Sequence, residues 1–406
     1  MRRLAVVAAL LVAASAPAQK FEGLAATPPM GWNSWNRFGC DVGEALVRET
    51  ADALVSAGLR DAGYVFVVID DCWQGTRDEN GVIRPDPRRF PSGMKALADD
   101  LHAKGLKLGV YSDAGAKTCG GRPGSRGFEY QDALQFARWG VDYLKYDWCN
   151  TEGLSPRGAY QTMRDALFAA GRPVVFSICE WGDTAPWTWG KEIGHLWRTT
   201  GDIHPCWDCE VGHGNWSSWG VMRILDRQPP LRAHAAPGHW NDPDMLEVGN
   251  GMTAAEDRAH FSMWCMLAAP LIAGNDLRSM SEETRRILAN REAIAVDQDP
   301  LGVPGWRYLD EGGVEVWFKP LAGDEWAMCV LNRNAEPRKV RFEWRREDVK
   351  DDLSERRATF DATTYRVRDV WTGRELGTTN EALAAEVPGH DVVMVRLAAP
   401  QKGASP

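Results

Sequence analysis

Between Pro28 and about residue 300, short apolar runs alternate with amphipathic stretches. The apolar runs, such as VFVVIDDC (65–72) and KLGVYSD (107–113), are nearly continuous, as expected for parallel strands covered on both faces. Intervening stretches such as VRETADALVSAGLRDAG have helical periodicity and end on a glycine that suits a helix C-cap. The pattern predicts an α/β fold with a (β/α)₈ barrel, and a doubly wound open sheet is the structural alternative.

The barrel is expected over residues 24–302, with a second domain after a linker. Its strands are predicted at 29–35, 65–72, 107–113, 142–148, 174–181, 195–202, 239–246 and 269–276. The linker DQDPLGVPGW is followed by segments that alternate on a period of two, such as GVEVWFKPL and RKVRFEW. They predict a C-terminal antiparallel β-sandwich at 306–399. No GxGxxG motif follows a strand, so a nucleotide site has no support.

The N-terminus is typical of an export signal. A basic start precedes the apolar run LAVVAALLVAA, and Ala16-Pro17-Ala18 fits a cleavage site. We expect residues 1–18 to be a signal peptide, with an uncleaved anchor as the alternative, and the protein to be secreted or periplasmic. No later stretch approaches the ~18 apolar residues of a membrane span, so no membrane association is expected after cleavage.

Composition narrows the classes of partner. The formal net charge is −9 with both signs interspersed, which disfavours nucleic acid and anionic membranes. The 19 tryptophans supply flat faces that suit sugar rings, although most will serve packing. Nine cysteines in an exported chain favour disulfides, and the odd number leaves at least one thiol unpaired.

Polar side chains gather where the expected strands end, at the edge where barrel enzymes build their active sites. A stray rim charge explains any one of them, but it poorly explains a set repeated on six strands. The residues are Asp70, Asp71, Tyr111, Asp113, Lys145, Asp147, Glu180, Arg198, Asp202, Asp242 and Asp244.

Two carboxylates in this set suit glycoside hydrolysis. Lys145 and Asp147 share a strand face, and the ammonium is expected to lower the pKa of Asp147 and keep it ionised, as a nucleophile requires. A structural ion pair is the alternative. Asp202 is the candidate acid. Arg198 favours its ionised form, so the charge on Asp147 would have to favour its protonation.

Seven motifs together resemble the α-galactosidases of glycoside hydrolase family 27. The resemblance implies a barrel followed by an antiparallel β domain, a carbohydrate substrate, and a retaining mechanism with no metal and no organic cofactor. The motifs are TPPMGWNSWNRFGC, IDDCWQ, KLGVYSDAGAKTCGGRPGS, YLKYDWCN, CEWG, WRTTGDI and WNDPDML.

The resemblance also implies roles for single residues. Asp147 matches the nucleophile and Asp202 the acid/base. It implies disulfides between Cys40 and Cys72 and between Cys119 and Cys149. The positions that match the sugar subsite are Trp35, Asp70, Asp71, Tyr111, Lys145, Glu180, Arg198 and Asp244.

Some cysteines depart from the family pattern. Cys206 and Cys209 form a CxxC pair, which is either a local disulfide or, with His204 and His213, half of a zinc site. Cys179 has no evident partner. Cys265 and Cys329 lie in apolar runs and are expected to be buried free thiols.

The expected function is exo-hydrolysis of terminal α-D-galactosyl residues from oligosaccharides or galactomannan-type glycans. The alternatives are an α-N-acetylgalactosaminidase, a β-L-arabinopyranosidase or a non-catalytic carbohydrate-binding barrel. Glu180 followed by Trp181 resembles the galactose-type loop, and an intact Asp70-Asp71 pair argues against the arabinopyranosidase. The sequence leaves the oligomeric state open.

Overall fold

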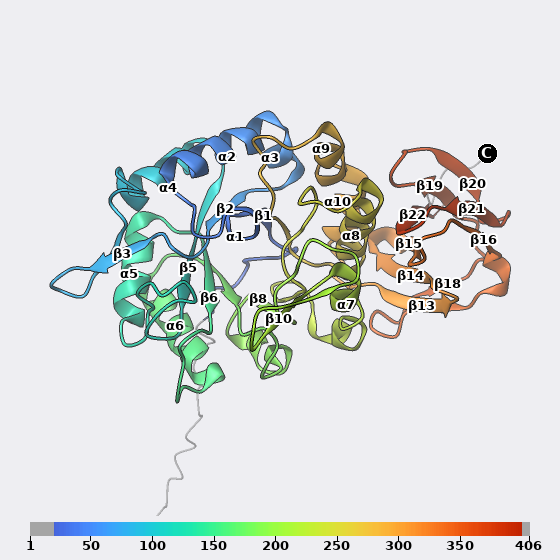
Figure 1. Ribbon diagram of the computed structural model, residues 1–406. Coiled ribbons are helices and arrows are strands. Elements are labelled where there is room, and N and C mark those ends of the chain that lie inside the picture. Colours follow the sequence, from blue (N-terminus) through green and yellow to red (C-terminus); the bar gives the residue numbers. More distant parts are fainter. Residues whose placement is uncertain (1–19, 400–406) are drawn as a thin grey trace, which may run out of the picture.

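The computed structural model describes residues 20–399 (Figure 1). The expected signal peptide and the C-terminal tail lie outside the described residues. Within the described range, no helix has both the length and the apolar character needed to cross a membrane.

Eight parallel strands form a ring, each inside one of the eight segments expected from the sequence. They are paired in the order β11-β8-β7-β6-β5-β2-β1-β12. A bridge between Leu246 and Ala273 joins the segment after β11 to β12 and closes the ring, which confirms a barrel rather than an open sheet. The strands are β1 (Met30–Asn33), β2 (Phe66–Ile69), β5 (Lys107–Asp113), β6 (Tyr143–Asp147), β7 (Val175–Ile178), β8 (Leu196–Arg198), β11 (Trp240–Asp242) and β12 (Leu271–Ala273).

Helices surround the ring, and local sequence signals fix several of their ends. Helix α6 begins with Pro156 in its first turn and ends before Gly171, which is left-handed at φ 77°. Helix α8 begins with a capping box between Thr253 and Glu256. The helices are α1 (Trp35–Phe38), α2 (Glu44–Ser56), α3 (Leu59–Ala62), α4 (Gly93–Ala103), α5 (Glu129–Trp139), α6 (Pro156–Ala170), α7 (Val221–Leu225), α8 (Ala254–Leu267), α9 (Glu282–Leu288) and α10 (Arg291–Asp297).

Two antiparallel hairpins interrupt the barrel. Strands β3 (Gln74–Arg77) and β4 (Ile83–Pro85) form the hairpin after β2, which projects from the body in Figure 1. Strands β9 (Glu210–Gly212) and β10 (Ser217–Trp219) form the second, which follows β8 after a loop that contains Asp202. Both follow the carboxyl ends of barrel strands, so both belong to the face where barrel active sites are built.

The C-terminal strands form an antiparallel β domain, as the period-two pattern predicts. A six-stranded sheet in the order β13-β14-β15-β22-β19-β20 is accompanied by the pairs β16-β21 and β17-β18. The strands are β13 (Trp306–Glu311), β14 (Val314–Leu321), β15 (Glu325–Asn332), β16 (Arg338–Phe342), β17 (Val349–Lys350), β18 (Arg357–Ala358), β19 (Arg366–Asp369), β20 (Glu375–Thr378), β21 (Leu383–Val387) and β22 (Asp391–Ala398).

The six-stranded sheet is buried on both faces along its central strands. Trp317 and Cys329 belong to the core between the barrel strands and their helices, whereas Val316 and Phe318 belong to the core between the sheets. Neighbouring residues on a strand point to opposite faces, so β14 and β15 need apolar side chains at nearly every position. Helix α8 packs against β14, β15 and β22 at this boundary (Figure 1).

Six cysteines are paired within the described residues. Disulfides join Cys40 to Cys72, Cys119 to Cys149, and Cys206 to Cys209. The CxxC pair is therefore a local disulfide in this structure rather than a pair of thiolate ligands. Three buried thiols remain free, at Cys179, Cys265 and Cys329.

Candidate active site

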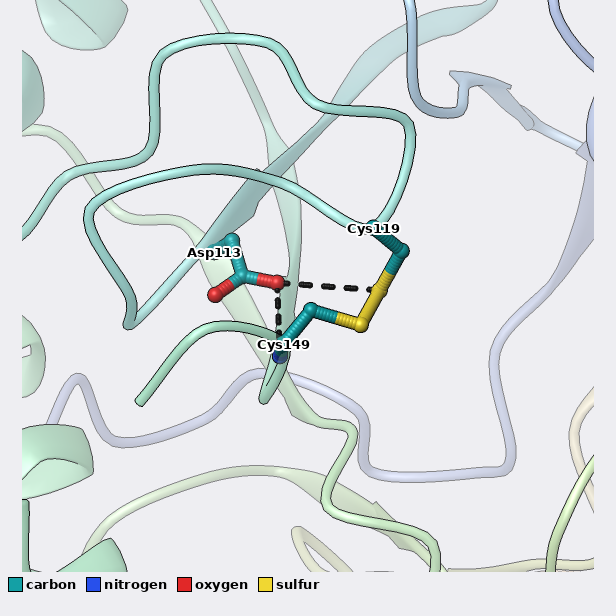
Figure 2. A group of neighbouring side chains, drawn as sticks. All are labelled: Asp113, Cys119 and Cys149. Carbon is teal, nitrogen blue, oxygen red and sulfur yellow. Dashed lines mark hydrogen bonds between the residues drawn. A yellow bond between two sulfur atoms is a disulfide. The ribbon is translucent and has the colours of Figure 1, made fainter. Parts of the chain in front are cut away.

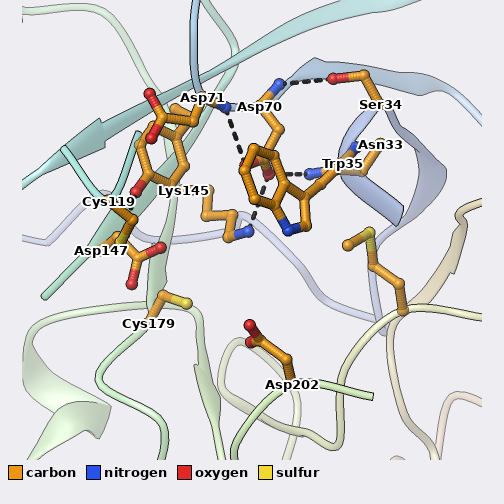
Figure 3. Close-up of polar contacts among 12 residues, drawn as sticks. Asn33, Ser34, Trp35, Asp70, Asp71, Cys119, Lys145, Asp147, Cys179 and Asp202 are labelled. Carbon is orange, nitrogen blue, oxygen red and sulfur yellow. Dashed lines mark hydrogen bonds and ion pairs between the residues drawn. The ribbon is translucent and has the colours of Figure 1, made fainter. Parts of the chain in front are cut away.

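A narrow cavity of about 50 Å³ opens at the carboxyl ends of the barrel strands. Figure 3 shows most of its side chains converging from different strands. Nine of the ten residues expected at the catalytic and sugar-binding positions line it. They are Trp35, Asp70, Asp71, Tyr111, Lys145, Asp147, Arg198, Asp202 and Asp244.

Asp70 and Lys145 form a buried ion pair on one side of the cavity. Lys145 Nζ donates to Asp70 Oδ2 at 2.8 Å, and Asn33 Nδ2 donates to the same oxygen at 2.7 Å. The backbone N–H of Asp70 donates to Ser34 Oγ at 3.0 Å. These contacts hold strands β1, β2 and β6 together at the cavity, and among the described residues Asp70 Oδ1 accepts only the neighbouring Asp71 N–H.

Asp147 lies deep in the cavity, at the end of β6 and on the same face as Lys145. It is 6% exposed, and burial raises its pKa to about 6, although Lys145 acts in the opposite direction. Lys145 lowers the pKa of Asp147, as expected, but the net shift is upward. The ammonium is engaged by Asp70, and the loss of hydration of the Asp147 carboxylate outweighs its attraction.

Asp202 lies nearer to solvent, with its side chain 36% exposed. Strand β8 ends at Arg198, so Asp202 belongs to the following loop rather than to the strand expected there. Arg198 still reaches it at 3.0 Å and also contacts Asp244 at 2.9 Å. One guanidinium therefore serves two carboxylates, and its charge is shared between Asp202 and Asp244.

The wall of the cavity beside β5 is stiffened by a disulfide. Asp71 Oδ2 accepts the Gly120 N–H at 2.6 Å, and the Tyr111 hydroxyl donates to Cys119 Sγ at 3.3 Å. Figure 2 shows the Cys119–Cys149 bridge beside Asp113, which accepts the Cys149 N–H at 2.9 Å. Asp113 and the two sulfurs lie close enough to resemble a metal site, but sulfurs bonded to each other offer no thiolate ligand.

Glu180 does not line the cavity, unlike the other nine residues. It is fully buried, and its Oε2 accepts the backbone N–H and the hydroxyl of Thr184 at 2.8 and 2.9 Å. Trp181 lines the cavity in its place, with a left-handed φ of 59° that turns the chain just after β7. A role for Glu180 in direct sugar binding therefore has no geometric support here.

Four further residues line the cavity without having been singled out as sugar ligands: Asn36, Cys119, Trp181 and Met245. Trp181 and Met245 directly follow the carboxylates Glu180 and Asp244 in the sequence. Including the residue that follows each candidate in the sequence would have found both. Asn36 directly follows the candidate Trp35, so the same extension would have found it too, whereas Cys119 was singled out only as a disulfide partner.

Comparison with known proteins agrees with this geometry. The family model for α-galactosidase A matches residues 27–299, and the model for the α-galactosidase C-terminal β-sandwich domain matches residues 311–397. The chain belongs to the α-galactosidase (melibiase) family. It is 58% identical to α-galactosidase A of Cellvibrio japonicus over 394 residues, which cover 97% of each chain. It is 47% identical to α-galactosidase 3 of Arabidopsis thaliana, over 92% of this chain and 82% of the relative.

Solved structures of the melibiase family share the whole architecture. α-Galactosidase I from Mortierella vinacea matches with a TM-score of 0.84 and 37% identity, covering 92% of this chain and 98% of its own. α-Galactosidase from Saccharomyces cerevisiae with raffinose matches with a TM-score of 0.87 and 32% identity, covering 95% and 100%. A β-L-arabinopyranosidase from Geobacillus stearothermophilus is 24% identical at a TM-score of 0.79, a likeness of fold alone.

Proposed function

We propose that this melibiase is a retaining exo-α-galactosidase that releases terminal α-D-galactose from oligosaccharides or galactomannan-type glycans. One observation carries the proposal: a single cavity holds a deep carboxyl, Asp147, and a more exposed one, Asp202. A nucleophile must reach the anomeric carbon inside the site, whereas the acid must reach the bond to the departing group near the mouth. The curated relatives support galactose as the sugar.

In the proposed mechanism, an Asp147 carboxylate oxygen attacks the anomeric carbon while the bond to the glycosidic oxygen breaks. That oxygen takes the proton of Asp202 and leaves as an alcohol, and a galactosyl ester remains on Asp147. Asp202, now ionised, accepts a proton from water, and the water oxygen displaces Asp147 from the anomeric carbon. Two inversions return α-galactose.

The remaining cavity residues suit the binding of a neutral hexose. Asp70 and Asp71 are adjacent carboxylates that can accept hydrogen bonds from vicinal hydroxyls, and Lys145 and Arg198 supply donors. Trp35 offers an indole face to the apolar side of the ring. The structure with raffinose in a family member supports a carbohydrate substrate.

The stereochemistry of the first product tests the mechanism. Proton NMR in the first minutes of p-nitrophenyl α-D-galactoside hydrolysis should show α-galactose before mutarotation. A retaining site places the two carboxyl groups about 5–5.5 Å apart, against roughly 6.5–9.5 Å for an inverting site. Initial β-galactose would overturn the assignment of Asp147, and absence of hydrolysis would favour the non-catalytic carbohydrate-binding alternative.

Selectivity at the sugar 2-position separates the family activities. Trp181 lines the narrow cavity, and we expect its indole to block the space that an acetamide would need. We expect kcat/KM for the α-galactoside to exceed that for the α-N-acetylgalactosaminide by more than ~100-fold. The β-L-arabinopyranoside, which lacks the C6 hydroxymethyl group, should also be a poor substrate. Similar kcat/KM values on the two hexosides would contradict this assignment.

We also propose that the protein is exported to the periplasm or the medium. Three disulfides among the described residues suit an oxidising compartment. The intact mass of the exported protein should correspond to a chain that starts near Gln19. A chain that retains Met1 in the membrane fraction would contradict this.

A further inference from the structure

Asp242 is one of the polar residues at the ends of the barrel strands, yet it does not line the catalytic cavity. It ends strand β11, and its side chain lines a separate cavity of about 20 Å³ together with Lys145, Arg198 and Asp244. These three neighbours also line the catalytic cavity, so Asp242 lies behind residues that the substrate meets. Any effect of Asp242 on the reaction therefore passes through its neighbours.

The neighbour that Asp242 holds most directly is Asp244. Asp244 has a left-handed backbone with φ 87°, which residues other than glycine rarely adopt. Asp242 Oδ1 accepts the Asp244 N–H at 2.9 Å and closes the turn around Pro243. Short aspartate side chains stabilise turns in this way, by accepting the N–H two residues further on. Glycine would fit the turn without strain but has no carboxylate, so the strained Asp244 needs this support.

Asp244 in turn connects the turn to the loop that carries the proposed acid. Its Oδ2 accepts the Ile203 N–H at 2.9 Å and contacts Arg198 at 2.9 Å. Ile203 directly follows Asp202 in the sequence, and Arg198 contacts the Asp202 carboxylate at 3.0 Å. One oxygen of Asp244 therefore fixes both the backbone beside Asp202 and the guanidinium that contacts its side chain.

Asp202 depends on this support because it lies in a loop rather than in a strand. Among the described residues, Arg198 is the one hydrogen-bond partner of its side chain, which is 36% exposed. A general acid acts only within hydrogen-bond reach of the departing oxygen, and a small displacement of such a group lowers the rate strongly. The alignment of Asp202 is therefore sensitive to the turn at Asp244.

We propose that Asp242 is a positioning residue for proton donation by Asp202, and that it acts through the left-handed turn at Asp244. The inference rests on the proposed function, in which Asp202 protonates the departing oxygen. Without the acceptor on Asp242, the Asp244 backbone relaxes, its carboxylate loses its two contacts in the loop, and Asp202 loses its alignment. Proton donation should then suffer more than attack by Asp147, which lies on β6, outside this series of contacts.

A set of variants separates this positioning role from general support of the fold. Asp242→Ala removes the acceptor, whereas Asp242→Asn keeps an oxygen that can accept the same N–H. Asp242→Glu misplaces the acceptor by one methylene and serves the same test if Asp242→Ala does not fold. Asp299→Ala is the matched control, because Asp299 Oδ1 makes the same type of contact, to the Leu301 N–H at 3.0 Å. Asp299 lies between helix α10 and strand β13 and lines neither of the two cavities.

The measurement is kcat/KM on two substrates that differ only in the departing group. Phenyl α-D-galactoside releases a basic phenolate that needs protonation, whereas 2,4-dinitrophenyl α-D-galactoside releases a weakly basic one that leaves without it. The ratio of the two kcat/KM values reports proton donation, because sugar binding and the folded fraction affect both values alike. Asp202→Asn, which has no carboxyl proton to donate, sets the full effect, and its ratio should fall at least ~100-fold.

We expect the ratio to fall about tenfold in Asp242→Ala and to stay within about threefold of wild type in Asp242→Asn, which keeps the acceptor. Asp299→Ala should leave the ratio within about twofold, even where it lowers the melting temperature. A wild-type ratio in Asp242→Ala, with or without a loss on both substrates, would overturn the positioning role. A tenfold fall in Asp242→Asn would overturn the route through the turn, and the same fall in Asp299→Ala would show that the effect is not particular to Asp242.

The inference and the proposed function fail in different ways. If Asp202→Asn lowered kcat/KM equally on both substrates, Asp202 would not be the acid, and the proposed mechanism would be overturned together with the inference. If Asp202→Asn lowered the ratio but Asp242→Ala did not, Asp202 would remain the acid and the inference alone would be overturned.

Discussion

Two of the regions that hold buried charge in this molecule differ in balance. The catalytic cavity is lined by the five carboxylates Asp70, Asp71, Asp147, Asp202 and Asp244 but only two cationic side chains, Lys145 and Arg198. At the contact between the domains, by contrast, two buried carboxylates are each paired with one arginine: Arg258 meets Asp391, and Arg232 meets Asp351.

The difference shows what each region does with its charge. Paired charges at the domain contact satisfy each other, so they hold two surfaces in register and leave nothing for a ligand. The excess of carboxylates in the cavity stays only partly compensated, and burial raises the pKa of Asp147 to about 6. Burying carboxylates with too few cations or hydrogen-bond donors raises the free energy of the unliganded protein, and a sugar with many hydroxyl donors can lower it again.

The largest effect is expected from removing the nucleophile. Asp147→Asn replaces a carboxylate with an amide that cannot attack the anomeric carbon, so kcat should fall at least ~10⁴-fold. Stopped assays with p-nitrophenyl α-D-galactoside measure this, with circular dichroism to check folding. If the variant kept more than about a tenth of the wild-type kcat, the Asp147 carboxylate would not be the nucleophile.

Lys145→Met should be the next most severe change, about 10²-fold in kcat/KM, because it removes a cation from the carboxylate cluster. Lys145 favours ionised Asp147, so its loss should raise that pKa further. The wild-type kcat/KM should decline as the pH falls through about 6, and in the variant this decline should begin at higher pH. If the acidic decline of kcat/KM occurred at the same pH in wild type and variant, Asp147 would not be the group that controls it.

The domain contact should respond in stability rather than in turnover. Asp391 is 2% exposed and accepts from Arg258 Nε at 2.9 Å and from the Val392 N–H at 2.8 Å. Arg258→Met should lower the free energy of unfolding by about 2 kcal/mol, less than for a fully buried pair because the arginine is 29% exposed. Thermal unfolding measures the loss, while kcat/KM on the nitrophenyl galactoside should stay within twofold. A large loss of kcat/KM at a temperature where the variant is folded would show that the ion pair at the domain contact also supports catalysis.

The fold could be predicted from the sequence because its periodicity is strong. The eight apolar runs located the barrel strands, since parallel strands covered on both faces leave a continuous apolar signal. The domain change was visible at Pro300 and Gly302, where the pattern switches to a period of two.

The sequence predicted most of the residues that line the cavity, but it did not predict which hydrogen bonds and ion pairs they form. Strand spacing correctly placed Lys145 and Asp147 on one face, but it could not show that Asp70 engages the lysine at 2.8 Å. Nor could it show that Thr184 accounts for the hydrogen bonds to Glu180, or that a left-handed residue brings Trp181 into the cavity. These depend on loop geometry and on neighbours distant in sequence, which periodicity does not encode.

The smallest effect on turnover is expected from a buried aspartate outside the cavity. Asp297 is 1% exposed at the end of helix α10, its Oδ1 has no hydrogen-bond partner among the described residues, and burial raises its pKa to about 8. It resembles Asp147 in burial and in the direction of its pKa shift, yet it lies near Lys319 of the β domain rather than near the substrate. Asp297→Asn should therefore leave kcat/KM unchanged within about twofold, which makes it the matched control for Asp147→Asn.

The pH dependence of stability sharpens this last comparison. Because the folded-state pKa of Asp297 lies above its unfolded value of about 4, the folded protein binds more protons between those values, and this residue's contribution to stability falls as the pH rises from about 4 to 8. An asparagine does not titrate, so the melting temperature of Asp297→Asn relative to wild type should increase over that interval and level off above it. Differential scanning calorimetry at pH 5, 6.5 and 8 measures the trend, and a constant difference would mean that Asp297 does not titrate in that interval. Nitrophenyl galactoside assays on the same samples should show no matching trend in the activity ratio, because this buried charge lies at the domain contact and not in the catalytic cavity.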